Sequence, residues 1–201
     1  MQSFIEHART FPARIADRQQ EFAALAQGQQ PQALFISCSD SRVIPAMLTG
    51  ARPGEIFELR TAGNIVPRHW SESACGVAGT LEFAVQALHV SDIVVCGHSH
   101  CGAVKGLMRE QTVQTMPLLR RWLASAGYRP GDEPWQTRGL GEDPVAVTQQ
   151  HVLTQLDHLR SYPFIARRLS SGRLRLHAWY YTVETGEVLA HQPGSDAFKP
   201  L

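Results

Sequence analysis

An apolar segment that runs directly into reactive side chains is the feature that most constrains how this chain folds. Residues 33–36 are short and apolar enough for a buried strand, and the reactive stretch 37–42 follows without a break. Proteins of the α/β class place their chemistry at the carboxyl ends of such strands. Cys38, Asp40 and Arg42 occupy alternate positions, so an extended backbone directs them to one side. The stretch predicts an α/β fold with a reactive strand end.

Segments with the character of strands and helices alternate along the chain. Apolar segments typical of buried strands occur at 33–37, 55–59, 92–96 and 174–182. Periodic segments predict helices at 45–48, 73–89, 102–109, 112–123, 144–158 and 164–169. The turn at 184–186 predicts a return into an antiparallel edge strand at 187–191. This order favours a mainly parallel central β-sheet flanked by helices, with an antiparallel C-terminal edge strand.

The length of the chain is sufficient for one domain with a sizeable core. It has 201 residues, of which 43% are hydrophobic, and we expect a single domain over 1–201. Residues 1–28 predict an N-terminal helical arm in two pieces, with Thr10 capping the second piece and Gly28 ending it. The stretch 127–143 contains prolines and polar breakers and predicts a mobile surface segment.

Charge and apolar patterning argue against two classes of partner. The formal net charge is only +1, and no basic cluster with interleaved aromatic residues predicts a nucleic-acid groove. No apolar run reaches the length of a membrane span, and the N-terminus lacks the apolar core of a signal peptide. Four cysteines are too few for a disulfide scaffold and favour metal binding, catalysis or core packing in a reducing compartment. We expect a cytoplasmic protein without nucleic-acid or membrane partners.

Two predicted strand ends present side chains that bind zinc. Cys38 and Asp40 follow the strand at 33–37, and His98 and Cys101 follow the strand at 92–96. Thiolate, imidazole and carboxylate are zinc ligands, and a catalytic zinc site has three protein ligands and one exchangeable position. Arg42 competes with the metal for the Asp40 carboxylate and so decides whether that carboxylate binds it. The pattern predicts a zinc site with Cys38, His98 and Cys101 as ligands.

Each of these residues also has a structural interpretation. In the structural interpretation, Asp40 and Arg42 form a simple ion pair that stabilises a turn. Cys96 lies two residues before His98 and competes in principle with Cys101, but its apolar neighbours favour a core thiol. Cys75 is interpreted in the same way, and His100 is assigned to the surroundings of the metal or to solvent. The seven remaining histidines are scattered and favour ordinary surface or core positions.

Three motifs together resemble the β-class carbonic anhydrases. They are Cys38-Ser-Asp-Ser-Arg42, Arg60-Thr-Ala-Gly-Asn-Ile-Val-Pro67 and Gly97-His-Ser-His-Cys-Gly102, and the resemblance extends to Trp179-Tyr-Tyr181 and Glu184-Thr-Gly186. It implies the β-carbonic anhydrase fold and reversible hydration of carbon dioxide to bicarbonate and a proton. Zinc-bound hydroxide attacks CO2 in that mechanism, and the Asp40–Arg42 dyad gates the fourth zinc position, which Asp40 occupies in a closed state.

The resemblance also implies a substrate pocket and an assembly. Gln29 matches a glutamine that hydrogen-bonds substrate, and Phe57 and Ala62 match residues that line a CO2 pocket, partly across a dimer interface. We add Phe83 and Gly102 to this predicted pocket, although many relatives have Tyr at the position of Phe83. The arm and the helix rich in small residues suggest at least a dimer, so a homodimer or homotetramer is expected.

Three other functions use some of the same residues. A hydrolase of CS2 or COS shares the metal chemistry, because both molecules are linear isosteres of CO2. A non-catalytic zinc-binding scaffold is favoured by loss of Asp40 or Arg42, but both residues are present. A redox protein that uses Cys96 and Cys101 is the third alternative. Assays with each gas and under reductant distinguish these alternatives.

Overall fold

The sheet has the mixed topology that the sequence predicts. The computed structural model describes residues 1–69, 75–126 and 143–201. These residues form a six-stranded sheet of order β2-β1-β3-β4-β5-β6. The strands are β1 (Ala33–Cys38), β2 (Ile56–Thr61), β3 (Asp92–His98), β4 (Arg175–Tyr181), β5 (Val188–Gln192) and β6 (Ala197–Pro200). The first four strands are parallel, and β5 and β6 are antiparallel additions. Strand β6 was not predicted and replaces β5 as the edge strand.

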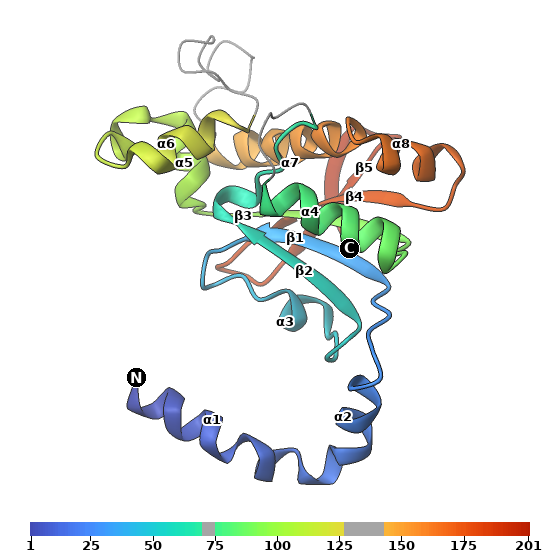
Figure 1. The fold of residues 1–201 in the computed structure, drawn as a ribbon. Coiled ribbons are helices and arrows are strands. Elements are labelled where there is room, and N and C mark those ends of the chain that lie inside the picture. Colours follow the sequence, from blue (N-terminus) through green and yellow to red (C-terminus); the bar gives the residue numbers. More distant parts are fainter. Residues whose placement is uncertain (70–74, 127–142) are drawn as a thin grey trace.

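Helices lie mainly on one face of the sheet. In Figure 1, α4 and α7 lie above β1 and β2, and the short α3 lies on the opposite side; residues of α4, α7 and α8 share the main core cluster with the strands. The helices are α1 (Gln2–Arg14), α2 (Gln19–Leu25), α3 (Pro45–Thr49), α4 (Gly76–Glu82), α5 (Gly102–Met108), α6 (Pro117–Ala124), α7 (Pro144–Arg160) and α8 (Pro163–Ser170). No helix in the described part of the chain combines the length and the apolar character needed to span a bilayer.

Alternate residues of the central strands build the cores on the two faces. Leu34 and Ile36 of β1 belong to the main core cluster with Ile93 and Val95 of β3. On the other face Phe35 is buried together with Val94 and Cys96. Burial raises the pKa of the Cys96 thiol to about 12. The prediction that Cys96 is a core thiol is confirmed.

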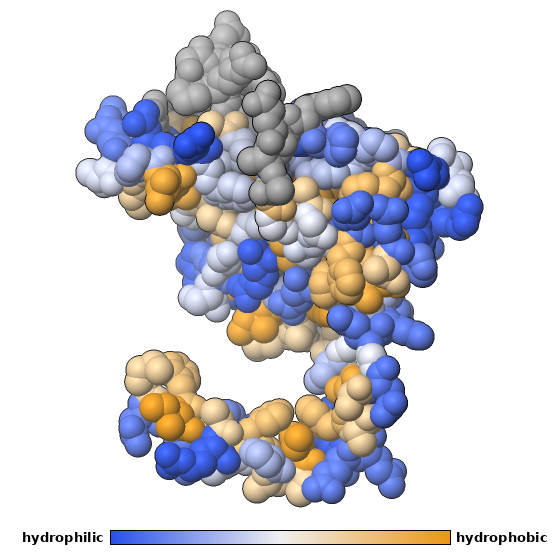
Figure 2. Space-filling view, viewed as in Figure 1, coloured by the Kyte–Doolittle hydropathy of each residue, from blue (hydrophilic) through white to orange (hydrophobic). Residues whose placement is uncertain are grey.

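The arm differs from its prediction in where it bends. Helix α1 runs through Thr10 and Pro12 to Arg14, and a 3-10 turn at Ala16–Arg18 precedes α2. The Thr10 hydroxyl donates to the carbonyl of Glu6 inside α1. The predicted cap at Thr10 is therefore wrong, because its side chain bonds back along the same helix. The arm extends from the body, and Figure 2 shows apolar residues gathered along it.

Three further predicted segments differ from the structure in their bounds or lie partly outside the described residues. The predicted helix 73–89 is described from Gly76 and changes at Phe83 into a π-helical turn that ends at Ala87. Residues 73 and 74 lie outside the described residues, as does nearly all of the predicted mobile segment 127–143. The predicted helix 112–123 is a 3-10 turn at Glu110–Val113 followed by α6, which begins at Pro117 because proline favours the first helical position.

Candidate metal centre

The topology of the sheet brings the three predicted ligands together. Strands β1 and β3 are adjacent and parallel, so their carboxyl ends lie at the same edge. Cys38 ends β1, His98 ends β3, and Cys101 is the N-cap of α5. Their ligand atoms all lie within 4.8 Å of one another, and all three residues are buried. This juxtaposition is the one that the two strand-end motifs predict.

The turn between His98 and Cys101 brings both side chains to one centre. The Ser99 N–H donates to the carbonyl of Tyr181 at 2.9 Å, which extends the pairing of β3 with β4 by one residue. His100 then has a left-handed backbone with φ of 56°. Helix α5 begins directly after Cys101. The chain therefore reverses direction within three residues, as the His-x2-Cys spacing requires.

The two thiols interact closely with each other. The Sγ atoms of Cys38 and Cys101 lie 3.9 Å apart, with the Cys101 thiol donating, and the Gly63 N–H also donates to the Cys38 sulfur at 3.3 Å. The hydrogen bond from Cys101 is the main reason that the pKa of Cys38 is lowered. The same bond, together with burial, raises the pKa of Cys101. Because two adjacent thiolates repel each other, a bound cation favours the form in which both sulfurs are deprotonated.

The imidazole of His98 has one nitrogen engaged and one free to bind a ligand. Its Nδ1 lies 2.8 Å from the carbonyl oxygen of Ser99, and because that oxygen only accepts, Nδ1 carries the proton. The residue is fully buried, and its Nε2 atom has no hydrogen-bond partner. A buried unpaired imidazole nitrogen beside two thiols has the donor chemistry of a zinc site. Cys38, His98 and Cys101 therefore fit a zinc ion.

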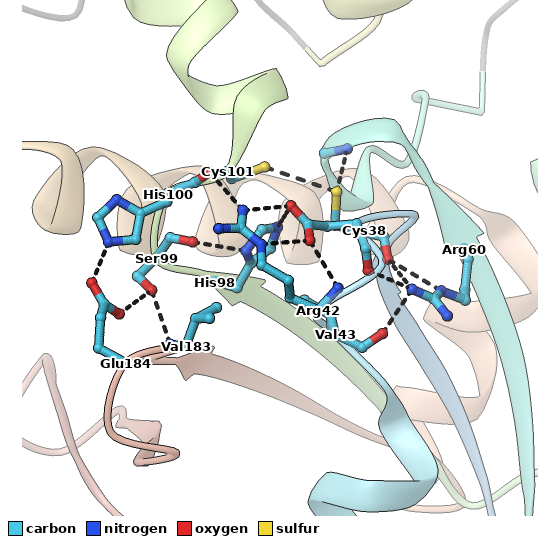
Figure 3. Close-up of polar contacts among 12 residues, drawn as sticks. Cys38, Arg42, Val43, Arg60, His98, Ser99, His100, Cys101, Val183 and Glu184 are labelled. Atoms are coloured by element: carbon cyan, nitrogen blue, oxygen red, sulfur yellow. Dashed lines mark hydrogen bonds and ion pairs between the residues drawn. The ribbon is translucent and has the colours of Figure 1, made fainter.

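Asp40 is paired with Arg42 at the edge of this centre. Arg42 donates from Nε and Nη2 to the two carboxylate oxygens at 2.9 and 2.8 Å, and its backbone N–H donates at 3.0 Å. The guanidinium holds the pKa of Asp40 well below its usual range. The Asp40 Oδ2 atom lies 3.9 Å from His98 Nε2. The carboxylate is thus ionised, bound by arginine and beside the ligand nitrogen (Figure 3).

Arg60 supports the loop that follows β1. Its guanidinium donates to the carbonyl oxygens of Cys38 at 3.1 Å, Asp40 at 2.8 Å and Val43 at 2.7 Å. Pairing of β2 with β1 places Arg60 opposite Ser37, directly beside this loop. The sequence offered one signal for this role, since an arginine begins the second motif at the end of a neighbouring strand.

A buried polar stripe on α7 fixes the segment beside Cys38. His151 Nε2 donates to the carbonyl of Gly63 at 2.8 Å, and Gln155 Oε1 accepts from the Val66 N–H at 2.9 Å. His158 Nδ1 donates to the Val66 carbonyl at 2.6 Å. Burial lowers the pKa of His151 to about 4, so this side chain is neutral near pH 7. Sequence reasoning placed both histidines among ordinary residues and predicted no such role for them.

Close packing also restricts Gly63. Its φ is 77°, and an added Cβ would lie 2.7 Å from the Cβ of Ala103. Only glycine combines this backbone conformation with such a close approach. Two features therefore hold the Gly63 N–H that donates to Cys38. They are the backbone conformation of Gly63 itself and the hydrogen bond from His151 to the Gly63 carbonyl.

The residues predicted to line the substrate pocket fall into two groups. Ala62 precedes Gly63, whose N–H contacts Cys38, and Gly102 follows Cys101, so both lie next to the ligands. Phe57 and Phe83 belong to the second group, and their aromatic rings contact each other with centroids 5.9 Å apart.

The second group lies near the amino ends of the strands, at the opposite end of the sheet from the candidate metal centre. Phe57 pairs with Leu34 near the start of β1, about 13 Å along the strand from Cys38. Gln29 is exposed and precedes β1. One chain therefore does not bring Gln29 and Phe57 to its own ligands, and their substrate role stays a prediction.

Comparisons with known proteins agree with one another. A family model described as "Carbonic anhydrase" matches residues 33–188. A carbonic anhydrase of Pseudomonas aeruginosa is 42% identical over 92% of this chain and 84% of that protein. One from Synechococcus elongatus is 40% identical over 94% of this chain and 71% of that protein.

Solved structures extend these similarities to the fold. The β-carbonic anhydrase CcaA superposes with a TM-score of 0.89 at 38% identity and covers 100% of this chain and 99% of that one. One of two tetrameric β-carbonic anhydrases from Sordaria macrospora superposes with a TM-score of 0.79 at 26% identity, covering 94% of this chain and 97% of that one. The shared fold includes the mixed sheet and its flanking helices.

Proposed function

The chain belongs to the β class of the carbonic anhydrase family, and from this premise we propose that it catalyses the zinc-dependent, reversible hydration of CO2 to bicarbonate. The observation that carries the proposal is the convergence of Cys38, His98 and Cys101 within 4.8 Å beside an ionised Asp40. Cys38, His98 and Cys101 would hold a zinc ion through two thiolates and one neutral imidazole, and three protein ligands are the number found in catalytic zinc sites.

Zinc bound to these residues supplies Lewis-acid chemistry, which lowers the pKa of water from 15.7 towards about 7. The protein's own contribution begins with the ligand set. Cys38 and Cys101 supply negative charge, and the Gly63 N–H donates to the Cys38 sulfur at 3.3 Å and so withdraws part of that charge. Nδ1 of His98 donates to Ser99, which orients Nε2 towards the sulfurs.

The Asp40–Arg42 pair acts as the gate of the open position. Arg42 keeps the carboxylate ionised and engages both of its oxygens by two side-chain hydrogen bonds. In this orientation Asp40 accepts a hydrogen bond from a protonated group that enters the site, and it repels anions that have no proton to donate. Release of Arg42 frees the carboxylate, whose Oδ2 already lies 3.9 Å from His98 Nε2.

We further propose that the working form is at least a homodimer. The side chains of Phe4, Ile5 and Phe11 on α1 are 72%, 44% and 44% exposed, an apolar surface that the arm does not bury against its own body (Figure 2). A second copy that covers the arm also brings a second set of Gln29 and Phe57 side chains, which are remote from the ligands of their own chain. A tetramer is the larger candidate, as in the Sordaria macrospora proteins.

A cytoplasmic location accompanies this proposal. The four cysteines Cys38, Cys75, Cys96 and Cys101 are all free thiols in the structure. Thiolate ligands persist in a reducing compartment, whereas an oxidising one favours disulfides. Fractionation of cells that express the tagged protein tests the location directly.

Stopped-flow measurement of CO2 hydration, with zinc quantified in the same samples, tests the proposed function. We expect one zinc per chain and activity that disappears on chelation and returns with zinc. Parallel assays with COS and CS2 distinguish the hydrolase alternative. Stoichiometric zinc without turnover of any of the three gases would instead support a non-catalytic scaffold.

Removal of residues 1–28 tests the role of the arm. We expect a smaller assembly in sedimentation or light scattering, together with reduced CO2 hydration. An assembly with the same number of chains as the full-length protein would contradict the proposed contact between the arm and a second copy.

A further inference from the structure

We propose that Glu184 is a positioning residue of the metal centre, which fixes the turn between the ligands His98 and Cys101. The inference deepens the proposed function and rests on it. Glu184 lies in the turn after β4, far from both ligands in sequence and next to them in space. Figure 3 shows its carboxylate reaching towards the Ser99–His100 turn.

The carboxylate contacts both residues that separate the two ligands. Its Oε2 atom accepts from the Ser99 hydroxyl at 2.7 Å, and its Oε1 atom pairs with Nε2 of His100. The same Ser99 hydroxyl accepts from the N–H of Val183 at 2.9 Å. A single turn of the chain thus holds Ser99 by two hydrogen bonds and His100 by one.

These contacts restrain a backbone conformation that is uncommon for a residue with a side chain. His100 has φ of 56°, in the left-handed region that few residues other than glycine adopt, although histidine adopts it more often than most. Such a conformation persists where surrounding contacts determine it. Glu184 supplies that contact from the side chain, and the conformation of His100 sets the direction in which Cys101 leaves the turn.

The same turn is connected to the ligand nitrogen and to the gate. The Ser99 carbonyl accepts from His98 Nδ1 at 2.8 Å, so the position of Ser99 sets the orientation of the imidazole. The His100 carbonyl accepts from Arg42 Nη2 at 3.3 Å, so the position of His100 bears on the arginine that holds Asp40. Loss of the Glu184 contacts is therefore expected to disturb both the His98 imidazole and the Arg42 side chain, although Glu184 contacts none of the three ligands.

Partial exposure makes Glu184 suitable for substitution. The side chains of His100 and Glu184 are 62% and 50% exposed, so truncation leaves no buried cavity. Hydrogen bonds from Ser99 and His100 hold the pKa of Glu184 at about 2, so the carboxylate is ionised at neutral pH. Glu187 is an exposed glutamate directly after the same turn, where its backbone N–H donates to the Thr185 hydroxyl, and it provides the matched control.

The experiment compares Glu184→Ala, Glu184→Gln and the control Glu187→Ala with the wild-type protein. Zinc affinity is measured by chelator competition, and Co²⁺ substitution gives an absorption spectrum that reports ligand geometry. We expect Glu184→Ala to weaken zinc binding about 10- to 100-fold, the range seen for residues that orient metal ligands, and to change the Co²⁺ spectrum. Glutamine keeps one acceptor for the Ser99 hydroxyl, and its amide N–H donates to His100 Nε2 when the neutral imidazole carries its proton on Nδ1, so Glu184→Gln should restore both measurements.

The outcomes separate this inference from the proposed function. Wild-type zinc affinity and an unaltered Co²⁺ spectrum in Glu184→Ala would overturn the positioning role, as would a change equal to that of Glu187→Ala. A wild-type protein that binds neither Zn²⁺ nor Co²⁺ would instead overturn the metal site itself. Ser99→Ala removes the same link from the other side and should reproduce the loss of affinity.

Discussion

The carboxyl ends of β1 and β3 contribute to one site, but they are fixed by side chains of opposite charge. After β1, the cation of Arg60 gathers three main-chain carbonyl groups. After β3, the anion of Glu184 gathers the donors of Ser99 and His100. Figure 3 shows Arg60 and Glu184 on opposite sides of the centre.

The two strand ends therefore differ in how much freedom they leave to the side chains of the site. Arg60 holds only the backbone of its loop, so the Asp40 side chain stays available to pair with Arg42 or to turn towards the ligands. Beyond β3 the side chain of His98 is itself buried and hydrogen-bonded. In the proposed mechanism the β3 end therefore supplies the more rigid ligands, and the β1 end supplies one ligand and the gate.

The largest effect is expected from removal of a ligand at the β3 end. His98→Ala and Cys101→Ser each leave two of the three ligands, so zinc content should fall far below one per chain. Activity should drop more than about 10⁴-fold, because water unassisted by the metal returns towards its pKa of 15.7. Metal analysis and stopped-flow assays on the same samples provide the check, and full activity in a zinc-free Cys101→Ser protein would refute the site.

The gate at the β1 end should separate activity from metal binding. Asp40→Asn keeps the shape of the side chain but loses its charge, so zinc should stay near one per chain while CO2 hydration falls about 10²- to 10⁴-fold. The same two measurements apply. Loss of zinc in parallel with activity would show that Asp40 supports the metal and does not gate it.

The support of the β1 loop should have a smaller effect. Arg60→Gln removes most of the donors to the carbonyls of Cys38, Asp40 and Val43, and zinc affinity should fall about 10- to 100-fold. Arg52→Gln is the control, since Arg52 pairs with Glu55 and its side chain is 70% exposed. Equal zinc affinities of the two variants in chelator competition would mean that the β1 loop holds its shape without Arg60.

The smallest effect on activity is expected from the buried stripe on α7, where pH is the sharper probe. Burial lowers the pKa of His151 from 6.5 to about 4, so the unfolded chain binds this proton more readily than the folded chain. Stability therefore rises with pH between about 4 and 6.5, and this one group contributes about 3 kcal/mol above that window.

Removal of the titrating group gives the test of that contribution. His151→Gln keeps a donor near the Gly63 carbonyl but cannot titrate, so its free energy of unfolding should depend less on pH between about 4 and 6.5. Chemical unfolding at several pH values measures the slope. The exposed residue His7 on the arm serves as the control, and a slope for His151→Gln equal to that of His7→Gln would contradict the assignment.

The convergence of Cys38 and His98 could be predicted from the sequence, because each residue follows an apolar segment that is recognisable as a strand. Cys38 and His98 each follow an apolar run, and parallel pairing places such ends together. Strand β6 was not readable, since Ala197–Pro200 is short, ends in Lys and Pro, and is specified by pairing with β5. The bend of the arm was misplaced because Thr10 bonds within α1.

Residues that position the chemistry were mostly not readable. Arg60, Glu184 and His151 act across long sequence separations, and their partners follow from the register of the sheet and the placement of α7. Local propensity contains no information about such contacts. The β1 and β3 motifs predicted that Cys38, His98 and Cys101 converge, whereas the contacts that Arg60, Glu184 and His151 make with the surrounding loops appear only in the fold.

Zinc K-edge X-ray absorption of the wild-type protein tests most directly whether the two strand ends share one metal. Cys38 and Cys101 predict two sulfur scatterers at about 2.3 Å, and His98 predicts one nitrogen scatterer at about 2.0–2.1 Å, with a light atom completing four-coordination. Any number of sulfur neighbours other than two would contradict a site shared by Cys38, His98 and Cys101.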